Sequence, residues 1–186
     1  MRTINRVNVS RIVGLFTLVL SSLWIASCSS VTVESYSGNS PKLIVDEFFD
    51  GDLSAHGVVK NRSGKVIRYF TADLKAYWKE GIGTLDESFV FDDGERQKRI
   101  WTLTPNQGKG YTATAGDVVG SGDLMTSGNA LFMKYVLQVP YNGDLINVNV
   151  DDRMYLVEDN VLLNESILTK FGFHVGSVTL VILKSP

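Results

Sequence analysis

Residues 66–79 read VIRYFTADLKAYWK, and apolar and polar side chains alternate along this segment. The apolar positions that share one face of the extended chain are Phe70, Ala72, Leu74, Ala76 and Trp78. Successive side chains of a β-strand point to opposite faces, so a repeat of two residues predicts a strand with one buried face. The same repeat over residues 131–139 predicts a second strand of this kind.

Short apolar runs continue to the end of the chain, separated every roughly 8 to 14 residues by clusters of glycine, asparagine and aspartate. The predicted strands are 42–49, 53–60, 66–79, 84–91, 95–104, 109–118, 130–139, 145–151, 153–158, 161–169 and 175–184. Short strands joined by tight turns favour an all-β fold, an antiparallel up-and-down meander that closes into a barrel, with a β-sandwich as the alternative. The glycine-rich segment 116–128 is predicted to be a mobile loop at the barrel mouth. A helix remains an alternative only for 161–170.

The hairpin predicted over residues 84–101 has a definite register. If residues 92–94 (Asp-Asp-Gly) form a three-residue turn with a left-handed glycine, Glu87 lies opposite Arg99 on a mainly apolar face. This pair is either a structural ion pair that fixes the register or a polar anchor in a cavity, able to hold a ligand carboxylate or headgroup. The candidate ligand-binding residues are Glu87, Phe89, Phe91, Arg99, Trp101 and Trp78.

The composition excludes several classes of protein. The 186 residues include 18 Lys and Arg against 20 Asp and Glu, and 44% are hydrophobic. No excess of basic residues indicates nucleic-acid binding, and the proportions are those of an ordered globular chain. With one cysteine, no intrachain disulfide can form. A chain of this length is expected to form one domain with a core that needs no covalent crosslink.

The N-terminus has the features of a bacterial lipoprotein signal peptide. Three arginines precede a nine-residue apolar run over 12–20, which is too short to span a bilayer. Residues 25–28 (Ile-Ala-Ser-Cys) then match a lipobox, an aliphatic residue and two small residues before cysteine. We therefore expect a signal peptide over 1–27 and an acylated Cys28, carrying chains such as palmitate, as the membrane anchor.

The expected domain organisation follows from the position of Cys28. Residues 28–40 are predicted to be the acylated cysteine and a polar tether, and residues 41–186 a single β-domain. Ser29 follows the cysteine in place of the aspartate that tends to retain lipoproteins in the inner membrane. The expected location is the outer membrane, facing the periplasm.

Several segments carry a family resemblance. They are 55–59, 68–70, 87–96, 99–101, 115–120, 128–131, 151–155, 170–172 and 175–176. Together they resemble a proteobacterial lipoprotein family of unknown function, domain of unknown function 3833, over nearly all of 42–184. The resemblance implies a periplasmic, lipid-anchored, lipocalin-like β-domain, and it supplies no catalytic residues. Family members are similar to proteins encoded near fatty-acid-modifying enzymes, which favours a link to lipid. The family commonly has tryptophan where this chain has Arg153.

The residues that could bind a metal or supply acid–base chemistry are mostly carboxylates. They are Asp92, Asp93, Glu95, Asp117, Asp151 and Asp152. Such groups could ligate Ca²⁺ or act as a catalytic pair, but aspartate is also favoured at tight turns for backbone reasons. Neither His56 nor His174 has the spacing of a zinc site. No metal and no cofactor is therefore predicted.

Three functions are compatible with these features. The preferred hypothesis is a membrane-anchored binder or carrier of a lipid or another apolar envelope molecule. The second is a structural or assembly lipoprotein that binds another envelope protein through its surface. The third is a hydrolase or isomerase acting on lipid or glycan, which would require Asp92, Glu95, Asp117 or His56 to converge in one cleft.

Overall fold

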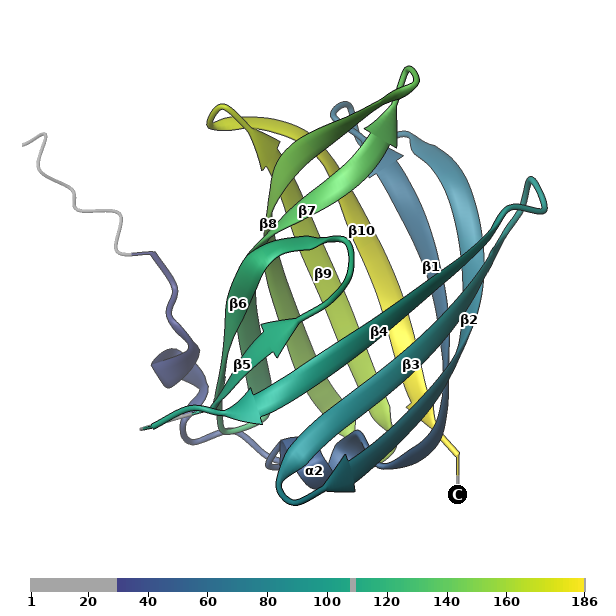
Figure 1. The fold of residues 1–186 in the computed structure, drawn as a ribbon. Coiled ribbons are helices and arrows are strands. Elements are labelled where there is room, and N and C mark those ends of the chain that lie inside the picture. Colours follow the sequence, from purple (N-terminus) through teal and green to yellow (C-terminus); the bar gives the residue numbers. More distant parts are fainter. Residues whose placement is uncertain (1–29, 108–109, 186) are drawn as a thin grey trace, which may run out of the picture. The chain divides into compact units, whose positions relative to one another are not determined.

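The computed structural model describes residues 30–107 and 110–185, which form ten strands and two short helical turns (Figure 1). The strands are β1 Gly51–Asn61, β2 Val66–Lys79, β3 Ile82–Phe91, β4 Arg96–Pro105, β5 Tyr111–Thr114, β6 Val118–Ser127, β7 Ala130–Tyr141, β8 Asp144–Glu158, β9 Val161–Lys170 and β10 Phe173–Lys184. The helical turns are η2 Val33–Tyr36 and α2 Val45–Phe48. Cys28 and the signal peptide lie outside the described residues.

The sheet is a closed antiparallel barrel. Each strand pairs with the next along the chain, and β1 pairs with β10 from Leu53 opposite Lys184 to Asn61 opposite Gly176. The predicted up-and-down barrel is confirmed, and the β-sandwich alternative is excluded. The hydrophobic core and all ten described strands lie within the compact unit Thr32–Pro186.

The hairpin of β3 and β4 has the predicted register. Glu87 lies opposite Arg99, and the Phe91 N–H donates to the Glu95 carbonyl at 2.9 Å. Gly94 adopts a φ of 85°, a left-handed conformation that glycine reaches without steric cost. A turn identified from three residues therefore sets which side chains of both strands face the barrel interior.

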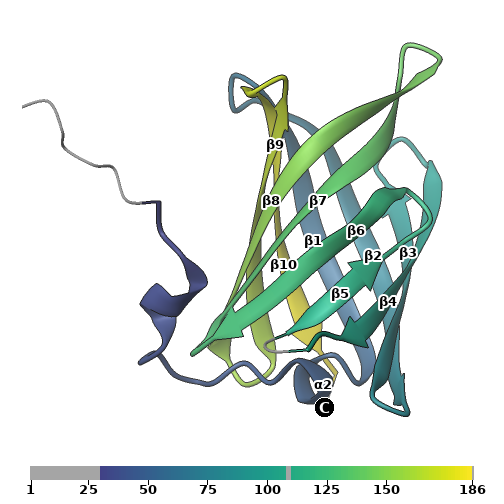
Figure 2. The same ribbon diagram turned by 60° about the vertical axis from the view of Figure 1, so that its left-hand side comes forward.

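The segment 42–49 is not the strand that the sequence predicted. It contains the single helical turn α2, and the core side chains Val45, Phe48 and Phe49 follow helical spacing. Figures 1 and 2 show α2 at one end of the barrel. The Trp78 indole N–H donates to the Phe49 carbonyl at 2.7 Å and ties this segment to β2. α2 thus covers the barrel end with apolar side chains.

The region between β4 and β7 also differs from the prediction. The predicted strand 109–118 is divided into the short β5 and the start of β6, and most of the predicted mobile loop 116–128 is β6. The glycines of this segment suggested a loop, but one of them permits close packing between strands. Gly122 is buried against Lys134 and Tyr135 of β7. The predicted strands 145–151 and 153–158 are one strand, β8, and 161–170 is strand β9 rather than helix.

Part of the predicted tether packs against the barrel. Val33 of η2 is 2% exposed and forms a cluster with Ala130 and Phe132 on β7. A Cβ atom at Gly128 would lie 1.8 Å from the Tyr36 carbonyl oxygen, so only glycine permits this approach. The compact unit Thr32–Pro186 therefore includes residues 32–40, which the sequence analysis assigned to the tether. Within residues 30–107 and 110–185, no helix is long and apolar enough to cross a membrane.

Two adjacent leucines on β9 test the assignment of inner and outer faces. Leu162 is fully buried in the core, whereas Leu163 is 44% exposed on the outer face. We expect Leu162→Ala to lower the free energy of unfolding by about 2–5 kcal/mol, through lost burial and a residual cavity. Leu163→Ala should lower it by less than about 1 kcal/mol. Urea unfolding of residues 29–186 measures both, and equal losses would contradict the facing described here.

Candidate functional site

The barrel encloses a cavity of about 200 Å³. Most of its lining is apolar and comes from the inner faces of nearly all the strands. Five of the six predicted ligand-binding residues line it, namely Glu87, Phe89, Phe91, Arg99 and Trp101. Trp78 does not, because its indole packs nearer α2, against Tyr111 and the Phe49 carbonyl. The inward alternation predicted for β2 and β7 supplies further lining residues, such as Leu74 and Met133.

Small inward-facing side chains leave this space empty. Ala55 on β1 and Ala72 on β2 line the cavity and are each 3% exposed. Barrel diameter increases with strand number, and eight strands already suffice to hold a small ligand or be filled by side chains. Ten strands with alanine at such positions therefore enclose a space that the chain's own side chains do not fill.

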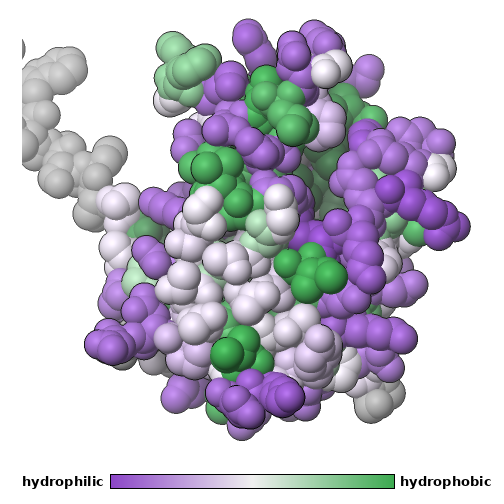
Figure 3. Space-filling model, viewed as in Figure 1, coloured by the Kyte–Doolittle hydropathy of each residue, from purple (hydrophilic) through white to green (hydrophobic). Residues whose placement is uncertain are grey.

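The barrel wall is interrupted beside the short hairpin of β5 and β6. Strand β5 pairs with β4 only from Thr102 to Pro105, and residues 96–101 of β4 extend beyond it. β6 meets β7 no further along than Leu137, so the end of β7 also extends past the hairpin. Figure 2 shows the shortened hairpin, and Figure 3 shows the surface hollowed between the flanking strands with apolar side chains inside. This opening connects the cavity with solvent.

Arg99 lies at this opening, and its principal partner is Asp117 in the β5–β6 turn. The guanidinium Nε donates to Asp117 Oδ1 at 3.0 Å, and Nη2 donates to Oδ2 at 2.7 Å. Nη1 is 4.0 Å from Glu87 Oε2. The predicted pair of Glu87 and Arg99 is therefore present but loose, and Asp117, predicted as a metal or polar candidate, makes the close bidentate contact.

The negative charge of Glu87 is buried, and the positive charge of Arg99 offsets the cost of this burial only in part. Its side chain is 14% exposed, and desolvation raises its pKa to about 7 from an ordinary 4.5. The positive charge of Arg99 lowers this pKa, whereas Asp152 and Asp117 raise it further. Glu87 thus changes its protonation state near neutral pH inside an apolar cavity.

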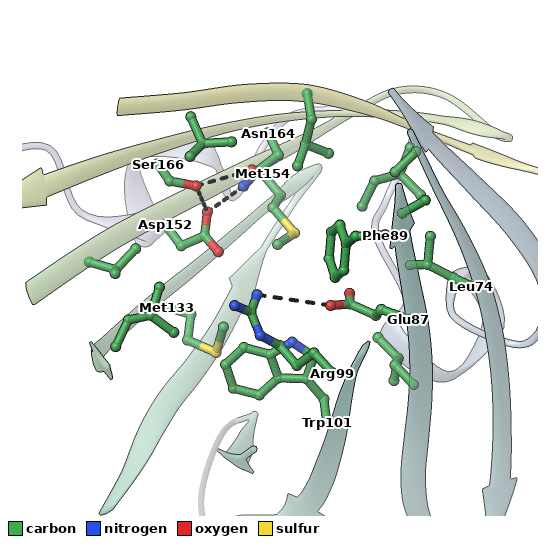
Figure 4. Close-up of a pocket in the computed structure, with 18 of the residues that line it drawn as sticks. Leu74, Glu87, Phe89, Arg99, Trp101, Met133, Asp152, Met154, Asn164 and Ser166 are labelled. Atoms are coloured by element: carbon green, nitrogen blue, oxygen red, sulfur yellow. Dashed lines mark hydrogen bonds and ion pairs between the residues drawn. The ribbon is translucent and has the colours of Figure 1, made fainter. Parts of the chain in front are cut away.

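A second polar cluster lies on β8 and β9. Asp152 is 5% exposed, and its Oδ1 accepts hydrogen bonds from the Asn164 amide and from the Ser166 hydroxyl, the latter at 2.7 Å. Burial raises the pKa of Asp152, and these two donors partly offset the effect. Figure 4 shows the Arg99 guanidinium between Asp152 on one wall and Glu87 on the other. Sequence reasoning missed Asn164 and Ser166, although both occupy inward positions in the alternation of β9.

Asp151 and Asp152 do not act as a pair. They are neighbours on one strand, so their side chains lie on opposite faces of the barrel wall. Asp151 contacts Arg153 at 3.0 Å and Lys134 at 3.6 Å on the outside, and the Arg153 hydrogen bond lowers its pKa. Only Asp152 reaches the cavity.

The acidic residues of the β3–β4 turn form contacts within the turn and with the adjacent strand β2. Asp93 and Glu95 each contact the Arg68 guanidinium at 2.9 Å, and Asp92 accepts the Tyr69 N–H at 3.2 Å. The backbone N–H of Glu95 is the main cause of the lowered pKa of Asp93, followed among the lowering contributions by Arg68. This cluster is therefore an outer feature of the barrel end.

The residues proposed for an enzyme do not converge. His56 on β1 and His174 on β10 are exposed and do not line the cavity. Within the part of the chain that the structure describes, no group of three or more His, Cys, Asp and Glu side chains could hold a metal ion. Of the four residues required to converge, Asp117 is held by Arg99 beside the cavity, whereas Asp92 and Glu95 belong to the β3–β4 turn and His56 is exposed on β1.

The raised pKa of Glu87 predicts a measurable pH dependence of stability. The folded state retains a proton that the unfolded state releases between pH 4.5 and about 7. The associated stability is fully present below pH 4.5 and is lost as the pH rises through about 7, to an extent on the order of 1–3 kcal/mol. Glu87→Gln should remove this loss, so that urea unfolding at pH 5 and pH 8 differs less in the variant than in the parent protein. Parallel pH profiles would show that Glu87 is well solvated.

Comparison with solved structures identifies chains of similar fold. The structure of the S-type phycobiliprotein lyase CPES from Guillardia theta superposes with a TM-score of 0.57 at 11% identity, covering 84% of this chain and 99% of the lyase. EF1p2_mFAP2b bound to DFHBI gives a TM-score of 0.45 at 8% identity, covering 75% of this chain and 95% of the other. At these identities the first likeness supports the barrel fold alone.

No curated protein matches the sequence. A family model described as a protein of unknown function, DUF3833, matches residues 22–184. This range includes every strand of the barrel and all the residues that line its cavity. The chain therefore belongs to the DUF3833 family, as the sequence resemblance indicated.

Proposed function

We propose that this protein binds an apolar small molecule inside its barrel while an acylated Cys28 holds it at the cell-envelope membrane. The observation that carries the proposal is the apolar cavity of about 200 Å³ with a few buried polar groups in its wall. Ligand sites typically combine a mainly apolar lining with a small number of polar groups that orient the ligand. An apolar cavity of roughly 150 Å³ is already enough to hold a benzene-sized molecule.

The position of the opening supports exchange of a ligand with the surroundings. The shortened β5–β6 hairpin leaves the wall open beside Arg99, and Asp117 in its turn closes part of the gap through hydrogen bonds. The structurally similar Guillardia theta protein is named as a lyase for phycobiliproteins, so this fold also accommodates proteins that act on others. Binding without chemistry is nevertheless the better proposal here, since the described catalytic candidates do not converge.

The anchor proposal rests on the sequence of residues 25–28 and on the short distance to the folded unit. Three residues lie between Cys28 and Thr32, and an extended chain spans at most roughly 3.6 Å per residue. Thr32 would thus lie within about 15 Å of the acylated Cys28, and Ser29 favours the periplasmic face of the outer membrane as the location.

A surface role is the second candidate, and one observation favours it. Phe171 and Phe173 flank the tip of the β9–β10 hairpin with 85% and 74% of their surface exposed. Tyr141 and Leu145 flank the β7–β8 tip and are 60% and 66% exposed. Large apolar side chains exposed at two hairpin tips of the same barrel end are candidate contacts for another macromolecule.

Binding can be tested with a neutral apolar fluorophore. Titration of residues 29–186 with N-phenyl-1-naphthylamine should give saturable fluorescence enhancement. Leu137→Trp, which fills space inside the cavity, should weaken binding at least about tenfold, whereas Val136→Trp on the outer face of the same strand should leave it unchanged. Absence of enhancement, or equal effects of the two variants, would contradict a site inside the barrel.

The anchor can be tested in cells with the full chain. Cys28→Ser should abolish labelling by radioactive palmitate and release the protein from the membrane fraction, because Cys28 is the single cysteine of the sequence. Ser29→Asp should retain labelling while shifting the protein to the inner membrane. Labelling that persists in Cys28→Ser would contradict the assignment, and an unlabelled parent protein would exclude acylation.

A further inference from the structure

The cavity wall holds more negative than positive charge. Of the described residues that line it, Glu87, Arg99 and Asp152 are charged. Asp117 approaches the same guanidinium from the opening, so a single cation faces three carboxylates. Like charges that share an apolar site disfavour one another's ionised form, and a ligand that brings a positive charge relieves this repulsion.

Asp117 occupies one edge of the Arg99 guanidinium, formed by Nε and Nη2. These two atoms make three hydrogen bonds to the two oxygens of Asp117, at 2.7 to 3.0 Å. The remaining Nη1 donors face Glu87 at 4.0 Å, so a ligand carboxylate that bound there would lie beside the negative charges of Glu87 and Asp152. The sequence-based expectation that the pair of Glu87 and Arg99 holds a ligand carboxylate is therefore not favoured by the geometry.

Two carboxylate oxygens remain available to a ligand. Glu87 accepts one side-chain hydrogen bond, from Trp101, and lies 4.0 Å from Arg99, which leaves one of its oxygens open. Both hydrogen bonds of Asp152 end on its Oδ1 atom, so Oδ2 is open. Figure 4 shows the second oxygen of Asp152 directed into the cavity, with Met133, Met154 and Phe89 around the space. The raised pKa of Glu87 agrees with incomplete compensation of its charge.

We propose that the ligand of this cavity, if the proposed function holds, is an apolar molecule whose polar end donates hydrogen bonds, preferably a protonated amine. A free fatty acid is disfavoured as ligand. The amine would lie between Glu87 and Asp152 and supply the cation that these groups lack, while its apolar part contacts the aromatic and methionine side chains of the wall.

The test compares three probes with the same alkyl chain, namely decylamine, decanol and decanoate, below their micellar concentrations. Each displaces bound N-phenyl-1-naphthylamine from residues 29–186 at pH 7 and constant ionic strength. We expect decylamine to displace the fluorophore at a concentration at least about tenfold lower than decanoate, with decanol between them. Preference for decanoate, equal potency, or no displacement of a bound fluorophore would overturn the assignment of ligand class. The proposed function itself fails only if the fluorophore does not bind.

Matched variants show which carboxylates cause the preference for decylamine over decanoate. Glu87→Gln combined with Asp152→Asn removes both inner carboxylates and retains an oxygen acceptor at each position. Asp86→Asn combined with Asp151→Asn removes the same charge at adjacent outer positions. We expect the ratio of decylamine to decanoate affinity to fall about tenfold in the inner pair and to remain unchanged in the outer pair. If this ratio fell equally in both double variants, the preference would come from net charge and the proposal would be overturned. If the inner double variant does not fold, Glu87→Gln alone is compared with Asp86→Asn in the same way.

Discussion

The pairing of the first strand with the last closes the barrel, and the cavity inside it depends on this closure. Once β1 and β10 are hydrogen-bonded, every strand has two neighbours along most of its length, and one face of each strand is turned inward. The number of strands then sets the diameter, and ten strands enclose more space than alanines such as Ala55 and Ala72 can fill. The cavity is therefore a consequence of closure combined with small inward residues.

The short hairpin that interrupts the barrel wall also supplies the partner of the inward-facing Arg99. An arginine on an inward-facing position needs a partner, because burying an unpaired charge is strongly unfavourable. The turn that precedes β6 supplies Asp117, and the Gln138 N–H donates to the Asp117 carbonyl at 2.8 Å, which fixes the turn against β7. The same short hairpin that opens the wall thus carries the group that neutralises Arg99, so access to the cavity and its electrostatics depend on one segment.

Local sequence patterns were sufficient for the barrel and for half of the site. Alternation identified the inner faces of β2 and β7, and the Asp92–Gly94 turn placed Glu87 opposite Arg99. The contact of Arg99 with Asp117 joins residues from different hairpins, and no local pattern specifies such a distance. Segment 42–49 was assigned to a strand because a short apolar run fits both periods, and β6 was assigned to a loop because its glycines suggested turns. Asn164 and Ser166 could have been found, since they interrupt an otherwise apolar inward series on β9.

Strand β6 connects the opening of the barrel with the end that α2 covers. This strand begins next to Asp117 at the opening and ends at Gly128, where the Leu43 N–H donates to the Gly128 carbonyl and the chain from η2 packs closely. The N-terminal segment therefore joins the barrel at the end covered by α2, away from the opening. The exposed residues Phe171 and Phe173 lie at the barrel end away from α2, at the end of β9 opposite Val161.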